Sequence, residues 1–325
     1  MNYFERTEGV EKEIYYHYTS VSALFNIVCS KSFWLTNLKS SNDKKELSYS
    51  LKEFVKDFCE IVDEEQDEKR KSKLALSREY MKDKTRSFMP IPDVFSLSLC
   101  CKGDDLTHWD RYAWNSTGVS IGINTAALRI YYTRLEIYDL VYNLLRVQEI
   151  SYDSDDRKDI LNRYIDAYYE NLRDIEEQYG DEFWEDIFPR YLFAIYFEMR
   201  LYVKLSAFID EDEVRVLFRS KMIDTIENII EREKVKIPEN AYVSVKENYT
   251  KLLNETGLRE KHFSMFGTGI RSYHSLCLKE IWGNGLIPEI ILGPKCTQDK
   301  KELRAFLDSH GLKGTKIIQS KVPLR

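Results

Sequence analysis

The chain has 325 residues, of which 43% are hydrophobic and 31% charged, and its formal net charge is −6. This composition is that of an ordinary globular protein, because thirteen glycines and seven prolines are too few for a collagen-like or low-complexity chain. The acidic balance argues against a broadly basic surface that would bind nucleic acid or an anionic membrane. A basic groove confined to one part of the surface is still compatible with this net charge.

Targeting signals and metal-binding patterns are both missing from the sequence. No apolar run reaches the roughly 18 residues of a membrane span, and the N-terminus carries no hydrophobic signal core. The six cysteines contain no C-x-x-C pair, and none has a histidine at zinc-finger spacing. We therefore expect a reduced, cytoplasmic protein that needs no metal and contacts no membrane.

The N-terminal region carries the first candidate binding residues. Residues 15–19 predict a short strand, followed by a helix over 21–29 with Ser20 as its N-cap and by a second strand at 33–36. Because strand side chains alternate between faces, Tyr15, His17 and Thr19 share one side. A polar ligand could lie there, across the sheet. The alternative is a half-buried strand whose histidine bonds a neighbouring carbonyl.

The next region alternates polar helices with apolar strands. Asn42 or Asp43 could cap a polar helical stretch, and the charged residues 62–86 predict a solvated helix or a mobile excursion. A strand is expected at 94–101, a helix at 106–114 and a strand at 118–123. On that helix, Trp109, Tyr112 and Ala113 are spaced to pack on the sheet, whereas His108 and Arg111 face elsewhere. Gly118 would allow a sharp backbone turn.

The second half of the chain contains an acidic cluster beside a strand. If the strand at 213–218 begins by Glu211, then Glu211, Glu213 and Arg215 share one face. Two carboxylates and a guanidinium on one face could stabilise a developing cation and clamp a phosphate. A solvated acidic turn is the alternative. Further strands are expected at 273–278, 287–292 and 315–319, and a helix at 298–310.

These elements predict an α+β protein whose mixed, mostly antiparallel sheet carries large helical insertions. We expect a single domain over residues 1–325. Its core strands are expected within 1–42, 90–152, 211–219 and 263–325, and the helical insertions at about 43–88, 154–207 and 222–258.

Several common catalytic motifs do not occur. The sequence has no G-x-G-x-x-G, no P-loop, no G-x-S-x-G nucleophile elbow and no H-E-x-x-H metal helix. A metal-dependent nuclease of the Asp and Glu-x-Lys kind would need a lysine where Arg215 stands, so Asp93 and Glu213 match that pattern only loosely.

Together, the motifs resemble the uncharacterised prokaryotic family called domain of unknown function 2971. The resemblance rests on an H-Y-T-S strand, an early Asn-Asp followed by Glu, an F-S-x-S strand, a W-x-x-Y-A helix, a G-[VI]-x-I-G strand, an E-x-E-x-R strand and an I-x-E-I-I-L-G-P segment. In this sequence these motifs begin at His17, Asn42, Phe95, Trp109, Gly118, Glu211 and Ile287.

The order of His17, Tyr112 and Glu213 also resembles the H-Y-E arrangement of ADP-ribosyltransferase folds, which implies NAD as a substrate. The resemblance implies that His17 binds the adenine-side ribose and that Tyr112 stacks on nicotinamide. It implies that Glu213 holds the nicotinamide ribose and stabilises the cation formed as nicotinamide leaves, and that Glu211 orients the acceptor. The cofactor-binding residues it implies are His17, Tyr18, Thr19, Arg215 and Arg271, the two arginines being candidates for the diphosphate.

Two classes of function follow from these resemblances. The first is an NAD-consuming ADP-ribosyltransferase-like enzyme or NAD glycohydrolase. It would act as a toxin-like or anti-phage effector on a protein or nucleic-acid acceptor, with a defence-system partner. The second is a non-catalytic module that binds a ligand or nucleic acid on the same scaffold, with a metal-dependent nuclease as a more distant alternative. Convergence of His17, Tyr112 and Glu213 on one cleft would favour the first class.

Overall fold

A computed structural model describes most of the chain. The described residues are 14–40, 49, 51–84, 93–128, 144–152, 154–171, 173–201, 203–204, 206–233, 239–266, 269–283 and 285–323. The expected helix cap at Asn42 or Asp43 lies outside them.

The N-terminal elements form as the sequence predicts. Strand β1 (Ile14–Thr19) leads into helix α1 (Val21–Ser30), and the Ser20 side chain caps α1 by accepting a hydrogen bond from the Ala23 N–H at 3.0 Å. Lys31, with a φ of 53°, ends the helix in the left-handed conformation. The chain then enters strand β2 (Ser32–Asn37).

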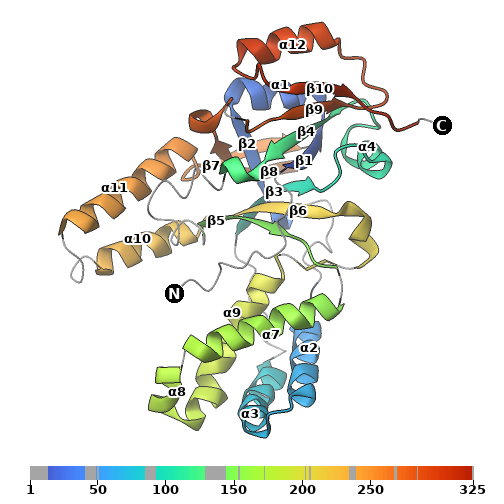
Figure 1. The fold of residues 1–325 in the computed structure, drawn as a ribbon. Helices are drawn as coiled ribbons and strands as arrows, with labels where there is room; N and C mark the ends of the chain where they lie inside the picture. The colour runs from blue at the N-terminus through green and yellow to red at the C-terminus, as the bar shows by residue number, and fades with distance from the viewer. Residues whose placement is uncertain are drawn as a thin grey trace.

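The remaining elements alternate between strands and helices of very different length (Figure 1). The strands are β3 (Val94–Cys100), β4 (Val119–Asn124), β5 (Leu145–Glu149), β6 (Glu213–Arg219), β7 (Lys261–Phe266), β8 (Gly269–Cys277), β9 (Glu289–Leu292) and β10 (Lys316–Gln319). The α-helices are α2 (Leu51–Glu64), α3 (Glu68–Lys84), α4 (Leu106–Tyr112), α7 (Ser154–Asn171), α8 (Arg173–Tyr179), α9 (Phe188–Met199), α10 (Met222–Glu233), α11 (Glu239–Thr256) and α12 (Lys300–Ser309). A π-helical turn (Phe183–Ile187) precedes α9, and 3₁₀ turns lie at Leu38–Ser40, Ser206–Glu211 and Lys279–Ile281.

The described strands form one ten-stranded sheet. Its main path is β10-β9-β4-β1-β3-β2-β8-β7, and β6 pairs with both β3 and β5 away from this path. Among these strands, only the β9–β10 pairing is parallel. The prediction of an α+β protein with a mixed, mostly antiparallel sheet is confirmed. Strands β5 and β7 were not predicted as separate strands.

Strand β3 is the point where the sheet divides. One edge of β3 pairs with β6 over its whole length. The other edge pairs with β1 only at Cys100 and with β2 only at Phe95 and Ser96. Between these contacts β1 and β2 diverge, and the Ser98 carbonyl accepts a hydrogen bond from the His17 ring Nδ1 at 3.0 Å. We call this gap, bounded by β1, β2 and residues 97–99 of β3, the fork.

The two faces of the sheet are covered differently. One face carries the largest apolar cluster, in which α1, α10, α11 and α12 pack on side chains such as Tyr15, Phe33 and Phe95. On the opposite face, Trp109 of α4 and Ala113 just after it pack against β1 and β9 in a small separate cluster. The fork opens on this second face.

Helices α2, α3, α7 and α9 form a third cluster with its own buried side chains, seen below the sheet in Figure 1. This cluster includes Val94 of β3 and Leu217 of β6, so it is continuous with the sheet. The predicted solvated helix within 62–86 is α3, whose Leu74 and Met81 are fully buried against the neighbouring helices. The expectation of a single domain over all 325 residues stays a prediction.

Within the described part of the chain, no helix combines the length and the apolar character that a membrane crossing requires.

Gly118 is needed for a reason that the sequence did not show. The left-handed turn before β4 is made by Trp114, Asn115 and Ser116, whose φ angles are 50°, 53° and 69°. Gly118 follows this turn, and a Cβ atom on it would lie 2.1 Å from the Thr19 carbonyl oxygen. The glycine is therefore required by the close approach of two backbones, not by the turn itself.

We expect Gly118→Ala to destabilise the protein by about 1–3 kcal/mol, the usual cost of forcing atoms into a filled space. Urea unfolding of the purified variant measures this. Gly314→Ala is the matched control, because a Cβ atom added at Gly314 would have no other atom within 4 Å. Equal stability of the two variants would contradict this account of the β1–β4 approach.

Candidate functional site: a charged pocket at the fork

The fork opens into a pocket of about 310 Å³. Its walls come from β1, β2, β3, β6 and β8, from α4, and from the segment that precedes β6. The lining residues are Tyr16, His17, Tyr18, Thr36, Ser98, Leu99, Cys100, His108, Tyr112, Lys204, Phe208, Glu211, Glu213 and Arg271. Its volume lies at the lower end of the ~300–1,000 Å³ range of small-molecule pockets.

Helix α4 holds one wall of the pocket in place. Asp105 caps the helix by accepting hydrogen bonds from the backbone N–H groups of Thr107 and His108. The buried Trp109 donates from its indole Nε1 to Asp104 at 2.7 Å. His108 is also buried, contrary to the expectation that it faces away from the sheet, because its Nε2 lies 2.9 Å from the Glu211 carbonyl oxygen.

Tyr112 does not pack on the sheet as its spacing from Trp109 suggested. It is 44% exposed, and its hydroxyl donates a hydrogen bond to Glu211 Oε1 at 2.6 Å. Burial and this bond raise the pKa of Tyr112, so its hydroxyl keeps its proton at neutral pH. Helix α4 therefore fixes Glu211 twice, through its backbone by His108 and through its side chain by Tyr112.

Lys204 joins the two carboxylates of the pocket. Its Nζ lies 2.7 Å from Glu211 Oε2 and 2.7 Å from Glu213 Oε2, and its side chain is only 6% exposed. Burial acts to lower the pKa of Lys204, but the Glu213 charge and the hydrogen bonds to Glu211 and Glu213 together raise it, so the ammonium stays protonated. One buried cation thus holds two carboxylates side by side in the same wall.

The backbone between the two carboxylates bends to allow this. Glu211 ends a 3₁₀ turn, and Glu213 begins β6. Glu211 therefore lies before the strand, whereas the sequence pattern predicted a position within the strand. Asp212 lies between them with a φ of 44°, a left-handed conformation that aspartate tolerates better than most residues. This break in the strand brings both acidic side chains to Lys204.

Glu213 is also paired with Arg215 below the pocket. Arg215 donates from Nε to Glu213 Oε1 and from Nη2 to Glu213 Oε2, both at 3.0 Å, and from Nη1 to the Leu201 carbonyl at 3.0 Å. Burial acts to raise the pKa of Glu213, but Arg215 and Lys204 outweigh it and hold this pKa at about 2. The Glu213 carboxylate is therefore ionised at neutral pH.

His17 of β1 is another residue that lines the pocket. Burial lowers the pKa of its imidazole, so the ring is neutral at neutral pH. Because a carbonyl oxygen can only accept, the proton on Nδ1 is the one donated to Ser98. The neutral ring then leaves Nε2 as an acceptor, which suits a ligand hydroxyl.

The pocket thiol is not an activated nucleophile. Burial raises the pKa of Cys100 to about 12, so the sulfur is a neutral thiol at neutral pH. Its Sγ lies 3.2 Å from the Lys102 carbonyl oxygen. Among the described residues, no group of three or more His, Cys, Asp and Glu side chains is arranged to hold a metal ion.

Comparison with known families identifies one match. A family model described as "Protein of unknown function (DUF2971)" matches residues 108–216. The chain resembles this family. The matched segment contains Tyr112, Lys204, Glu211 and Glu213, whereas the motifs that begin at His17 and Ile287 lie outside it. No curated protein and no solved structure matches the chain.

The structure brings together six of the eight site residues that the sequence suggested. His17, Tyr18, Tyr112, Glu211, Glu213 and Arg271 all line the pocket. Thr19 and Arg215 do not. Thr19 pairs with Val119 beyond the pocket, and Arg215 is fully buried with its donors directed at Glu213 and Leu201. Arg215 is therefore not placed to meet a diphosphate. The early Asn42-Asp43 motif lies outside the described residues.

Sequence reasoning missed Lys204, the residue that connects the acidic pair. Its one signal was a lone lysine next to apolar Val203, near the end of a helical region rich in buried aromatics. A cation in such a place requires a buried anionic partner. The sequence could not show that Glu211 and Glu213 are that partner.

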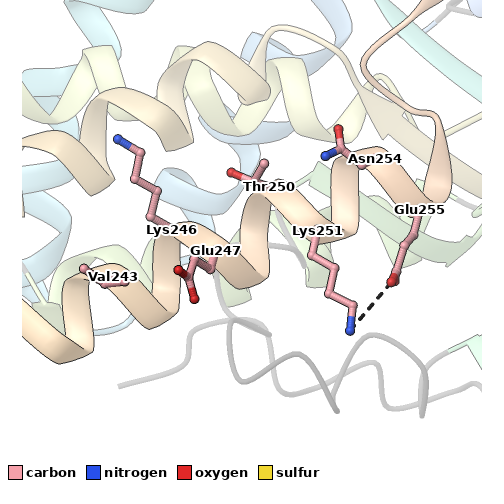
Figure 2. A pocket seen from close by; sticks show the side chains of 7 residues that line it. All are labelled: Val243, Lys246, Glu247, Thr250, Lys251, Asn254 and Glu255. Carbon is pink, nitrogen blue, oxygen red and sulfur yellow. Dashed lines mark ion pairs between the residues drawn. The ribbon is translucent and has the colours of Figure 1, made fainter.

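A second hollow of about 560 Å³ lies along α11 (Figure 2). Figure 2 shows that all seven of its labelled lining residues come from this one helix. Two of its lysines are paired, Lys246 with Glu231 and Lys251 with Glu255. Among the described residues, its lining brings together no side chains from different elements, in contrast to that of the fork pocket.

The pairing of Glu213 makes a prediction about acid stability. Because the folded pKa of about 2 is below the ordinary value of 4.5, the stabilisation from Glu213 is present above pH 4.5. It is lost as the pH falls from about 4.5 to about 2, and it amounts to on the order of 3 kcal/mol. We expect Glu213→Gln to be less stable at neutral pH and to lack this part of the acid-induced loss.

Urea unfolding at a series of pH values, from neutral to about 2, checks this expectation. Glu79→Gln is the control, since the Glu79 side chain on α3 is 73% exposed and should keep the parental acid dependence. If Glu213→Gln loses stability with falling pH as steeply as the parent, the pairing does not hold Glu213 ionised.

Proposed function

We propose that the fork pocket cleaves the bond between nicotinamide and ribose in NAD, as an ADP-ribosyltransferase-like enzyme or an NAD glycohydrolase. The observation that supports this best is that His17, Tyr112, Glu211 and Glu213 line the same pocket, although they come from four different elements of the chain.

The chemistry of this reaction suits a pocket with fixed carboxylates. As the N-glycosidic bond breaks, its electron pair leaves with nicotinamide and positive charge develops on the ribose. A water molecule or an acceptor hydroxyl then bonds to the C1′ carbon and loses its proton. A preorganised anion lowers the energy of the cationic transition state without a metal. Glu213 is ionised at neutral pH and meets this requirement.

The two carboxylates differ in their capacity to accept a further hydrogen bond. Glu213 accepts two from Arg215 and one from Lys204, and its side chain is 5% exposed. Glu211 accepts one from Tyr112 and one from Lys204, and its side chain is 13% exposed. A carboxylate offers about four acceptor sites. We therefore assign the contact with the ribose hydroxyl to Glu211. Glu213 would contribute a fixed negative charge next to that contact.

The other pocket residues complete the proposed site. Tyr112 offers a partly exposed ring on which nicotinamide can stack. The acceptor Nε2 of His17 suits a hydroxyl of the adenine-side ribose, and Arg271 brings a guanidinium for the diphosphate. The pocket is smaller than a whole dinucleotide, so the ligand must extend beyond it.

A second candidate is a non-catalytic module that binds a hydroxyl-bearing ligand. The observation in its favour is that Lys204 and Arg215 already neutralise the two carboxylates. Such a pocket can bind hydroxyl groups without stabilising a developing cation. A role as a toxin-like or anti-phage effector stays a prediction of the resemblance.

Carboxylate variants separate the two candidates. We expect Glu211→Gln to reduce nicotinamide release from NAD by roughly 10²–10³-fold, the usual cost of removing one electrostatic contact to the transition state. Glu213→Gln should also abolish turnover, together with the loss of stability described above. Nicotinamide is measured by chromatography, with protein and nucleic acid supplied as acceptors, and Glu79→Gln is the control. The proposal fails if the parent releases no nicotinamide or if both pocket variants match it.

His17 gives a separate test of substrate binding. We expect His17→Ala to raise KM for NAD by roughly 2–10-fold with little change in kcat, because a neutral hydrogen bond contributes about 0.5–1.5 kcal/mol. Thr19→Ala is the matched control, since Thr19 lies on the same strand but outside the pocket. Equal KM values for the two variants would show that His17 does not contribute to NAD binding.

A further inference from the structure

Three aromatic rings form a row across the sheet beside the pocket. Trp34 of β2 stacks on Tyr273 of β8 with ring centroids 4.1 Å apart and planes 21° apart. Tyr273 stacks in turn on His262 of β7, at 5.3 Å and 30°. Trp34 is 44% exposed, and the His262 side chain is 38% exposed. We call these three residues the aromatic row.

The aromatic row begins where the pocket ends. Thr36, which lines the pocket, is the cross-strand partner of Tyr273. Arg271 also lines the pocket and lies two residues before Tyr273 on β8, so the two share a face of the strand. Trp34 lies two residues before Thr36 on β2 and shares its face for the same reason. The pocket and the row are thus one continuous surface.

We propose that the aromatic row is a platform on which a nucleobase stacks while Arg271 meets the phosphate attached to it. A nucleotide joins a flat ring to an anionic group. Tyr273 stacks between Trp34 and His262, so a base stacks at an end of the row, and the 44% exposed Trp34 offers such an end. Arg271, on the same face of β8 as Tyr273, supplies the guanidinium. Bases stack on aromatic side chains irrespective of sequence, and arginine is suited to phosphate. This platform rests on the proposed function in one respect. If NAD is the substrate, the platform would hold the part of NAD that does not fit inside the pocket.

Two sources could supply such a nucleobase. One is the adenine half of NAD, and the other is a base of a single-stranded nucleic-acid acceptor. Both present a base joined to a phosphate, so the same platform suits either. The structural alternative is that the three rings only strengthen the pairing of β7, which ends the main path of the sheet.

Binding assays that involve no bond cleavage test the platform. ADP-ribose, which lacks nicotinamide, and a ten-nucleotide oligothymidylate are each titrated calorimetrically into the parent and into Trp34→Leu. We expect Trp34→Leu to weaken binding of at least one ligand by about 5- to 150-fold, the range that base stacking on one ring supplies. The ligand that responds identifies the source of the base.

Trp114→Leu is the matched control, because Trp114 is 73% exposed at the end of α4 and is not part of the row. It should bind both ligands as the parent does. Unchanged affinities in Trp34→Leu, with only a lower Tm, would show that the row is structural and would overturn the proposal. A parent that binds neither ligand would also overturn it.

The outcomes separate this proposal from the proposed function. Binding that depends on Trp34, in a parent that releases no nicotinamide, would support the platform and refute the cleavage of NAD. Normal nicotinamide release and unchanged affinities in Trp34→Leu would support the cleavage and refute the platform.

Discussion

The pocket depends on one interaction, the contact of the Lys204 ammonium with both Glu211 and Glu213. Two carboxylates in one buried wall repel each other, and without a cation between them one would take up a proton. Lys204 and the buried Arg215 supply two positive charges to the two negative ones, and they keep the pKa of Glu213 at about 2. The charges are therefore fixed before any ligand arrives, which is the condition for electrostatic stabilisation of a transition state.

The sheet provides the space in which this charge pair can act. Because β1 and β2 diverge from β3, no strand in the described part of the chain pairs with residues 97–99 on that edge, and the His17 ring donates a hydrogen bond to the Ser98 carbonyl. Helix α4 closes the opposite wall and restrains Glu211 through His108 and Tyr112. The same surface continues over Trp34 and Tyr273, so that a ligand longer than the pocket has a path along the sheet.

The elements of the core were predictable from the sequence, and the geometry of the site was only partly so. Short β-branched and aromatic runs predicted β1, β3 and β6 because the hydrophobic pattern and local propensity agree there. The division of the sheet at β3 depends on pairings distant in sequence, and no local signal reports them. Lys204 was missed for the same reason. Glu213 and Arg215 share one face of β6, as the alternation predicted. Arg215 was misplaced because that face is buried as well, so its guanidinium bonds Glu213 and Leu201 and does not face a ligand.

The most direct test of this account is a crystal structure of the protein with a carbocyclic NAD analogue, whose nicotinamide bond cannot be cleaved. The account predicts that the analogue lies in the fork, with a hydroxyl of its nicotinamide-side ring within about 2.6–3.2 Å of a Glu211 carboxylate oxygen. It also predicts nicotinamide against the Tyr112 ring. An analogue bound elsewhere, or a fork without the analogue at saturating concentration, would contradict it.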